Sequence, residues 1–357
     1  MKDRSALVLG FGLFLTTMHP AQAVFIRDDV PVSSYNSLAL QPAYAAAGYL
    51  KFYNVTGSSY TVGTCSGTLI SPTKVLTAAH CFTTADGVVS PATSRSFGTT
   101  AAVPAFDASA TANIASFVNS LLYTSGPTKG LATNDVSIVT LTTAIADIKP
   151  AAIYLGEDVQ GKTATIIGYG GQGSGTVPGP KGLQGANDRL GGTNVLDVAN
   201  SNVIQIDFDS PAGDKNTYGS ATPLSLEASV AGGDSGGPLF IDVSGTALVV
   251  GDLNGGKNNL GAADLYGDTN SYAPFVNPDN AAFIIANAPD AVFDRAVPTT
   301  AGTGVAQVAD NTILASIAKT GTVFDFQANT PVPEPASMAL LAAGLGACVA
   351  IRRRKVG

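Results

Sequence analysis

The chain contains the hexapeptide Gly233-Asp234-Ser235-Gly236-Gly237-Pro238, the most informative stretch of its 357 residues. A serine hydroxyl is a weak nucleophile at its ordinary pKa, so it needs a base within hydrogen-bond reach and donors for the oxyanion that it creates. Glycines around Asp234 and Ser235 permit a tight turn that aims the N–H groups of Gly233 and Ser235 at one point. The hexapeptide therefore marks Ser235 as a candidate nucleophile and the Gly233 and Ser235 amides as a candidate oxyanion hole. The alternative is a glycine-rich hairpin, because Asp-Ser-Gly is also common in turns.

The candidate base is His80. The chain has two histidines, and His19 falls within an N-terminal export signal, so His80 is the only imidazole in the mature protein. It stands in Val75-Leu76-Thr77-Ala78-Ala79-His80-Cys81, where an apolar strand end is followed by a cysteine that can fix the turn. A lone histidine is more often a surface or core residue than a base, but these neighbours favour a base.

Three segments follow one another as Cys65-Ser66-Gly67-Thr68-Leu69-Ile70, Thr77-Ala78-Ala79-His80-Cys81 and Gly233-Asp234-Ser235-Gly236-Gly237-Pro238. Together they resemble the trypsin/chymotrypsin family of serine proteases, and the resemblance spans residues 50–287. It implies an all-β fold of two six-stranded antiparallel β-barrels with a C-terminal helix, and a catalytic triad in the chain order His, Asp, Ser. It also implies that Cys65 and Cys81 form a disulfide beside the histidine.

The third member of the triad is assigned to Asp135, which directly precedes the strand pattern of residues 136–141. This placement resembles the family's Asp-aliphatic-Ala-Leu segment, although Ser137 stands where alanine is usual. The role of Asp135 would be to fix the His80 tautomer and to stabilise the imidazolium. A strand-capping aspartate is the alternative, and three other acids are fallback candidates: Asp107, Asp147 and Asp158.

Substrate specificity is assigned to Ser229, because in the family the residue six positions before the nucleophile lies at the base of the primary pocket. An uncharged serine does not select Arg or Lys as an aspartate would, and it is more compatible with apolar or small side chains. The family's Ser-Trp-Gly pocket wall has no clear counterpart, since the chain contains no tryptophan. We expect the pocket walls near residues 251–256 and 261–265.

Activation is also assigned from the resemblance. Family members often pair a newly formed N-terminus with the aspartate beside the nucleophile, which is Asp234 here. No Arg-Ile-Val-Gly-Gly-like cleavage site precedes the body of the chain. Val24, exposed when the export signal is removed, is the candidate source of that ammonium.

Residues 1–23 have the order of a cleavable secretory signal. A charged start, Met1-Lys2-Asp3-Arg4, is followed by an apolar run over residues 6–15 and by the small-residue site Ala21-Gln22-Ala23. The apolar run is about half of the roughly 20 residues that span a bilayer, so cleavage is favoured over a membrane anchor.

Residues 332–357 form a second targeting segment. Val332-Pro333-Glu334-Pro335 precedes an uncharged stretch at 336–351 and the cluster Arg352-Arg353-Arg354-Lys355. This order resembles the PEP-CTERM sorting signals of Gram-negative bacteria, which are processed by an exosortase. It implies a short apolar transmembrane helix at 336–351 before processing, a cytoplasmic basic end, and a mature protein that is secreted or held in the cell envelope or at the outer surface. An ordinary tail anchor is the alternative.

The composition excludes some partners. With a net charge of −7 and 13% charged residues, the chain has no basic stripe to neutralise phosphates, so nucleic acid is not an expected partner. Cys348 lies in the C-terminal apolar segment, which leaves Cys65 and Cys81, and two cysteines in an exported domain predict one disulfide. No metal site is expected because there is no second cysteine pair or spare histidine, and no cofactor is required.

Between the targeting segments we expect an N-terminal arm at 24–49, the protease domain at 50–287 and a spacer at 288–331. The 40 glycines and 20 prolines indicate short strands joined by turns. Strands are predicted at 60–70, 75–79, 136–141, 164–167, 194–198, 203–208, 238–241 and 247–250, a long loop at 170–192, and a helix at 281–287 capped by Asn277-Pro278-Asp279.

These patterns predict an exported serine endopeptidase that cleaves protein or peptide substrates through an acyl-enzyme. The alternative is a surface-displayed binding or structural module that keeps a protease fold without turnover.

Overall fold

A computed structural model describes residues 24–56, 59–83, 89, 92, 94–103, 113–123, 134–177, 189–219, 221–257, 265–294 and 321–325. For residues 55–56, 59–61 and 321–325 it describes only the backbone of the strands. Apart from Asp325, these residues belong to one compact unit that ends at Phe324.

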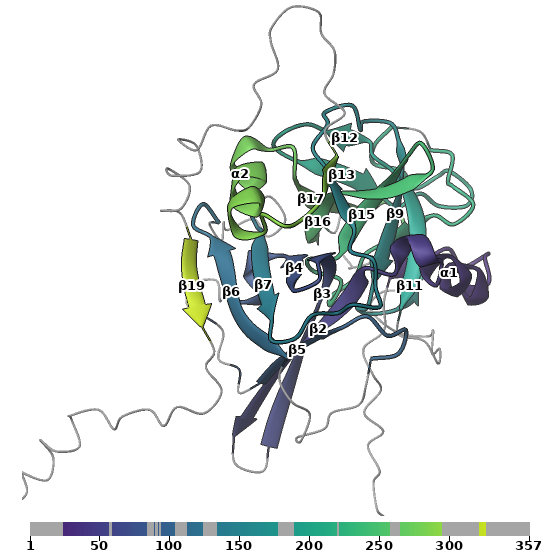
Figure 1. Cartoon of the computed structure of the whole chain (residues 1–357). Coiled ribbons are helices and arrows are strands. Elements are labelled where there is room, and N and C mark those ends of the chain that lie inside the picture. The colour runs from purple at the N-terminus through teal and green to yellow at the C-terminus, as the bar shows by residue number, and fades with distance from the viewer. Residues whose placement is uncertain are drawn as a thin grey trace, which may run out of the picture. The chain divides into compact units, whose positions relative to one another are not determined.

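The first sheet is built from strands of the N-terminal half of the chain and from β19, which comes much later in the sequence. Its strands are β2 (Ala47–Thr56), β3 (Ser59–Ser71), β4 (Lys74–Thr77), β5 (Ser94–Gly98), β6 (Ile114–Ser120), β7 (Ser137–Leu141) and β19 (Gly321–Asp325). Their spatial order is β19-β6-β7-β4-β3-β2-β5 (Figure 1). Every neighbouring pair in this order from β6 to β5 is antiparallel. β2 and β3 form a long hairpin that is paired along the whole length of β2.

The second sheet follows in the sequence. Its strands are β8 (Ala152–Tyr154), β9 (Thr163–Gly168), β11 (Leu190–Val195), β12 (Val198–Ala199), β13 (Ile204–Asp207), β15 (Pro238–Val243), β16 (Thr246–Lys257), β17 (Thr269–Pro274) and β18 (Phe293–Asp294). The order is β11-β9-β15-β16-β17-β13-β12, with β8 on β16 and β18 on β8. A small third sheet sets β1 (Phe25–Ile26) between β10 (Gly173–Ser174) and β14 (Ala228–Ser229), so the N-terminal arm is woven into the domain.

Two apolar cores hold these sheets. One gathers side chains of the first sheet around stacked Phe82 and Phe117, whose ring centroids are 4.2 Å apart. The other lies on the second sheet and includes Ile166, Leu239 and Tyr272. Each fully buried large side chain contributes about 1.5–3 kcal/mol by leaving water, so burial drives these sheets to curl and close on themselves.

Two α-helices occur in the described residues. The helix α2 (Pro278–Asn287) begins at Asn277, whose side chain accepts hydrogen bonds from the N–H groups of Asp279 and Asn280, and it packs Phe283 and Ile284 into the core of the first sheet. The helix α1 (Val32–Ala39) lies against β11 (Figure 1). Short 3-10 turns, η1 (Pro42–Tyr44) and η2 (Ala79–Cys81), precede β2 and follow β4.

The two-barrel, mainly β architecture expected from the resemblance is confirmed. The capped C-terminal helix is also present, three residues longer at its start than predicted. Three details differ: the expected arm contains α1, β2 begins at Ala47 within the expected arm, and β11 begins at Leu190, inside the loop expected at 170–192. None of the described helices is long and apolar enough to cross a membrane. The predicted secretory signal at 1–23 and the predicted apolar transmembrane segment at 336–351 lie outside the described residues.

Candidate active site

The strand pair β4–β7 brings His80 and Asp135 together. The two strands are antiparallel, with Thr77 opposite Ser137. His80 lies three residues beyond Thr77, in the turn η2, and Asp135 lies two residues before Ser137. Both residues therefore leave the sheet at the same end, although they are 55 positions apart in the chain.

Asp135 holds His80 through two hydrogen bonds. Its Oδ2 lies 2.5 Å from the imidazole Nδ1, and its Oδ1 accepts a bond of 2.8 Å from the His80 backbone N–H. The Asp135 side chain is 1% exposed, whereas that of His80 is 28% exposed. The carboxylate thus fixes one ring nitrogen from inside the protein, which leaves Nε2 as the nitrogen for proton transfer.

Ser235 stands in the turn directly before β15 of the second sheet. Its carbonyl accepts a 2.8 Å hydrogen bond from Ser66 N–H in β3 of the first sheet. The Ser66 hydroxyl donates to the Gly233 carbonyl and accepts from Tyr169 N–H, both at 3.2 Å, and the Ser66 carbonyl accepts from the Thr77 hydroxyl at 2.7 Å. One buried serine therefore fastens the turn that carries Ser235 to the strand that leads to His80.

The glycines of the turn are required by its backbone. Gly233 has φ +103° and Gly236 φ +74°, values that side chains disfavour, and a Cβ on Gly233 would lie 2.7 Å from Gly170 Cα. The N–H groups of Asp234, Gly236 and Gly237 all have backbone acceptors. Within the described part of the chain, those of Gly233 and Ser235 have none, so both remain available to an oxyanion.

Cys65 and Cys81 form a disulfide. It joins β3 to the turn η2 that carries His80. Cys81 Sγ also lies 3.7 Å from the Ser235 carbonyl oxygen. The bridge thus braces the histidine turn next to the nucleophile.

Asp234 lies beneath the nucleophile turn and is 1% exposed. Its carboxylate accepts hydrogen bonds from the N–H groups of Gly170 (2.7 Å), Ala231 (2.8 Å) and Val24 (3.3 Å). Burial raises the pKa of Asp234 to about 7, although these N–H groups lower it in part. The backbone nitrogen of Val24 is therefore directed at the acid expected to receive the N-terminus.

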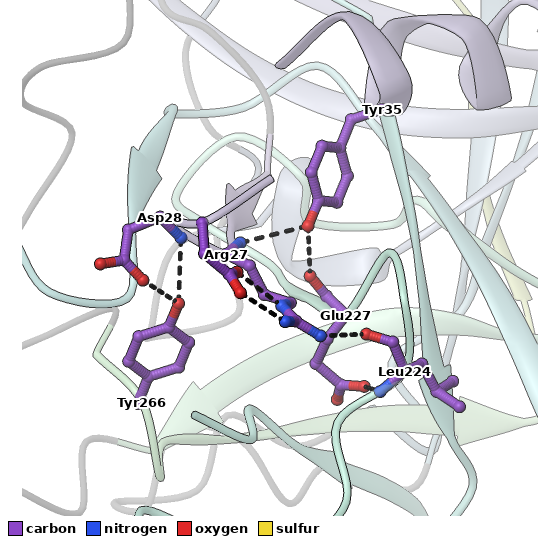
Figure 2. Close-up of polar contacts among 7 residues, drawn as sticks. Arg27, Asp28, Tyr35, Leu224, Glu227 and Tyr266 are labelled. Atoms are coloured by element: carbon purple, nitrogen blue, oxygen red, sulfur yellow. Dashed lines mark hydrogen bonds and ion pairs between the residues drawn. The ribbon is translucent and has the colours of Figure 1, made fainter. Parts of the chain in front are cut away.

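Figure 2 shows how the segment after Val24 is fastened. Tyr35 Oη accepts from Arg27 N–H at 3.2 Å and donates to the Glu227 carbonyl at 3.1 Å, while the Arg27 guanidinium donates to the Leu224 carbonyl at 2.8 Å. Tyr266 Oη donates to the Asp28 carboxylate at 2.6 Å. The arm is thus bound to the segments 224–229 and 265–266, which lead into the cavity beside Ser235.

That cavity has a volume of about 170 Å³ and contains Ser235 in its lining. Ser229, the residue assigned to specificity, also lines it, and its hydroxyl donates to Asn270 Oδ1 at 2.7 Å. The expected wall at 251–256 is present as Leu253, Gly255 and Gly256. Residues 258–264, which include most of the second expected wall, lie outside the described residues.

Two buried polar residues of this region were not predicted from the sequence. Asn270 comes from β17, and only the pairing of that strand with Gly256 places it in the cavity. Asp252 is 1% exposed, and its two carboxyl oxygens have no hydrogen-bond partner among the described residues. Burial, reinforced by the charge of Asp135, raises the pKa of Asp252 well above its usual range. Asp252 could have been noticed because it is an aspartate within the largely apolar run 247–253. No feature of the neighbouring sequence marked Asn270.

A further cluster of acids lies on the second sheet. Burial raises the pKa of Asp197 and Asp209 to about 7 and that of Glu227 to about 9. Asp207 accepts from the N–H groups of Thr217 and Tyr218. No group of three His, Cys, Asp or Glu side chains in the described ranges is arranged to hold a metal ion.

Comparison with known families agrees with this geometry. The family model described as Trypsin matches residues 43–276. The chain belongs to the trypsin family. A second model, the PEP-CTERM protein-sorting motif, matches residues 331–355 and indicates export and surface sorting in Gram-negative bacteria. Among solved structures, the trypsin-family chain is similar to a Glu endopeptidase in complex with MPD, at 20% identity and a TM-score of 0.45, covering 75% of this chain and 97% of that one. No curated protein matches.

Proposed function

We propose that the protein is an exported serine endopeptidase that hydrolyses peptide bonds through an acyl-enzyme. The observation that carries this proposal is the pair of hydrogen bonds between Asp135 and His80, next to the turn that presents Ser235. A binding module has no physical need for an imidazole fixed in this way, and the trypsin-family match supports the enzyme.

In the proposed reaction Ser235 Oγ attacks the scissile carbonyl while His80 Nε2 takes its proton. Asp135 keeps the ring in the required tautomer and stabilises the imidazolium. The N–H groups of Gly233 and Ser235 stabilise the oxyanion of the tetrahedral intermediate. His80 then protonates the leaving amine, and a water molecule deacylates Ser235 by the same route.

Activation follows from signal removal in this proposal. In the full chain Val24 has φ +69°, a conformation that a β-branched residue adopts only under strain. Cleavage after Ala23 removes the peptide bond that defines this angle. It also converts the nitrogen that lies 3.3 Å from Asp234 Oδ2 into an ammonium. The new terminus can therefore pair with the buried carboxylate without a separate zymogen cleavage.

Export completes the proposal. The secretory signal at 1–23 directs the chain outward, and the sorting motif at 331–355 is the substrate of an exosortase-type enzyme. Before that processing step the apolar segment 336–351 would attach the chain to the membrane. The proposed mature enzyme acts in the envelope or at the outer surface.

Fluorophosphonate labelling of purified residues 24–331 tests the enzymatic assignment. We expect stoichiometric labelling that is lost in Ser235→Ala and falls steeply in His80→Ala. The matched control is Ser271→Ala, at a serine of β17 whose hydroxyl accepts from the Gln205 amide, and this variant should label normally. Absence of labelling from folded protein with an authentic Val24 terminus would favour the non-catalytic module.

A further inference from the structure

The cavity beside Ser235 contains the Asn270 side-chain amide, which binding of a small or apolar substrate side chain would not use. This inference rests on the proposed endopeptidase function, since a cavity next to the nucleophile then receives the side chain before the scissile bond, called P1. Its lining includes Ser229, Gly256 and Asn270 together with the charged residues Lys257 and Asp268.

The orientation of the Asn270 amide is fixed by its neighbours. One atom of the amide lies 3.3 Å from the Val230 backbone nitrogen and 2.7 Å from Ser229 Oγ. A backbone N–H can only donate, so this atom is the carbonyl oxygen Oδ1. Its two lone pairs are then occupied, and the NH₂ group is the end of the side chain that remains for a ligand.

The Asn270 NH₂ group is the uncommitted end of a side chain that is otherwise buried. Asn270 is 4% exposed, and in the described residues Nδ2 has no hydrogen-bond acceptor. Gly256 faces it across the β16–β17 pair, where a Cβ would lie 3.0 Å from Nδ2. The absence of a side chain at Gly256 therefore leaves this donor uncovered on the cavity side.

The two charged residues of the lining, Asp268 and Lys257, differ in the contacts that they make with the rest of the protein. Asp268 is 3% exposed, and its Oδ2 accepts a 3.1 Å hydrogen bond from Leu265 N–H. Lys257 is exposed at the end of β16 and forms no ion pair within the described residues. Among the described residues, the lining thus offers two uncommitted donors, Asn270 Nδ2 and the Lys257 ammonium, whereas its one carboxylate already accepts a hydrogen bond from its own turn.

We infer that Asn270 is a specificity-determining residue, and that the enzyme prefers a P1 side chain that ends in a hydrogen-bond acceptor, as in Gln or Glu. Such a side chain accepts from Asn270 Nδ2 at the base of the cavity. An apolar P1 residue would instead bury this donor without a partner, and sites with unpaired polar groups discriminate against such substrates. The preference differs from the small or apolar P1 residue expected from Ser229 alone.

The test is a set of fluorogenic peptides that differ only at P1, with Gln, Glu, Met or Lys. We expect kcat/KM for the better of Gln and Glu to exceed that for Met, an apolar residue of similar length, by about 10-fold or more. The ratio of kcat/KM for the Glu peptide to that for the Gln peptide reports whether the charge of Lys257 or that of Asp268 has the larger effect on the bound P1 side chain. Concentrations of active enzyme are normalised by fluorophosphonate titration.

Asn270→Asp inverts the chemistry with little change in shape. An aspartate keeps an oxygen for Ser229 and Val230 but replaces the donor with an acceptor, so the preference for Gln and Glu should be lost and cleavage after Lys should rise. Ser271→Ala, on the same strand, should keep the wild-type ranking.

Either of two results overturns the inference while leaving the proposed function intact. The first is a wild-type preparation that titrates with fluorophosphonate and, in its unlabelled form, cleaves after Met as well as after Gln and Glu. The second is an Asn270→Asp preparation that titrates in the same way and retains the wild-type ranking. If Asn270→Asp does not label, the wild-type substrate set alone decides. A wild-type protein that does not label contradicts the proposed function itself.

Discussion

Ser66 illustrates at the scale of one residue how the site is assembled. It is fully buried and makes hydrogen bonds to Ser235, Gly233, Tyr169 and Thr77, which come from both sheets. Two of these bonds use its backbone, so they survive substitution of the side chain. The other two use the hydroxyl, and these are the bonds that a mutation can remove.

Ser66→Ala should therefore lower both stability and activity. It removes the hydroxyl that accepts from the Tyr169 N–H and leaves the buried Gly233 carbonyl without this donor, which costs about 1–3 kcal/mol for a buried group left unsatisfied. We expect a lower denaturation midpoint and a reduced kcat with a smaller change in KM, because the oxyanion turn loosens. Ser37→Ala, at an exposed serine of α1, is the control. Unchanged kcat in Ser66→Ala would show that the hydroxyl does not hold the turn.

Glu227 gives a pH-dependent prediction. It is 2% exposed and its Oε2 accepts from Leu224 N–H, while burial raises its pKa to about 9. A carboxyl whose pKa rises on folding adds stability below its unfolded pKa, near 4.5, and loses it as the pH climbs through about 9. The contribution of Glu227 to the free energy of unfolding of the wild type should therefore fall between pH 4.5 and about 9.

Glu227→Gln cannot ionise, and its amide oxygen can still accept from Leu224. Thermal denaturation at several pH values between 5 and 9 should show a growing advantage of Glu227→Gln over the wild type as the pH rises. Glu157→Gln, at an exposed glutamate, should run parallel to the wild type. Parallel curves for Glu227→Gln as well would mean that Glu227 is ionised in the native protein.

At the scale of elements, the sequence predicted those helices and strands whose signal lies within a few neighbouring residues. The cap Asn277-Pro278-Asp279 predicted α2, and the apolar runs predicted β3, β9 and β15, because their burial follows directly from their composition. The start of β11, at 190–193, was missed because glycine weakens isolated strands, although a strand was predicted from Asn194. Its glycines are needed for packing: a Cβ on Gly191 would lie 2.6 Å from an Ile167 methyl, and one on Gly192 would lie 2.1 Å from Ala228 Cβ.

The candidate site divides in the same way. His80, Asp135 and Ser235 lie in short motifs and were assigned from them, whereas Asn270 depends on which residue of β17 faces Gly256. Cross-strand register is a tertiary property, and the sequence of β17 alone does not specify it.

The disulfide allows an element-scale test of how η2 is held. The double variant Cys65→Ala, Cys81→Ala removes a bridge between residues 16 positions apart, which should cost about 3 kcal/mol by the chain-entropy estimate. Because η2 carries His80, activity should decline at temperatures where the protein is still folded, as seen by comparing circular dichroism with fluorophosphonate labelling. Activity and ellipticity lost together would indicate that the bridge stabilises the domain without positioning the histidine.

At the scale of the whole molecule, the N-terminal arm links export to the active site. Residues 24–29 run from Val24, whose nitrogen faces Asp234, to Arg27 and Asp28, which are bonded to Tyr35, Leu224 and Tyr266 (Figure 2). With a neutral amide at Val24, the buried Asp234 carboxyl has a pKa of about 7. Stability from this group is then lost as the pH rises from about 4 through 7. An ammonium at Val24 would lower that pKa and remove the loss.

Enzyme that begins at Val24 should consequently differ from enzyme with one added residue before Val24. The extended form should be less active at pH 8 and should lose stability between pH 5 and 8, whereas the authentic form should not. Labelling rates, kcat/KM and denaturation midpoints measure these differences in matched preparations. Asp234→Asn removes the carboxylate from both forms and should make them equivalent. The authentic and extended forms that retain Asp234 could instead show equal activity and equal pH dependence. That result would mean that the arm is held by the Arg27, Asp28 and Tyr35 contacts alone, and that removal of the signal does not switch the enzyme on.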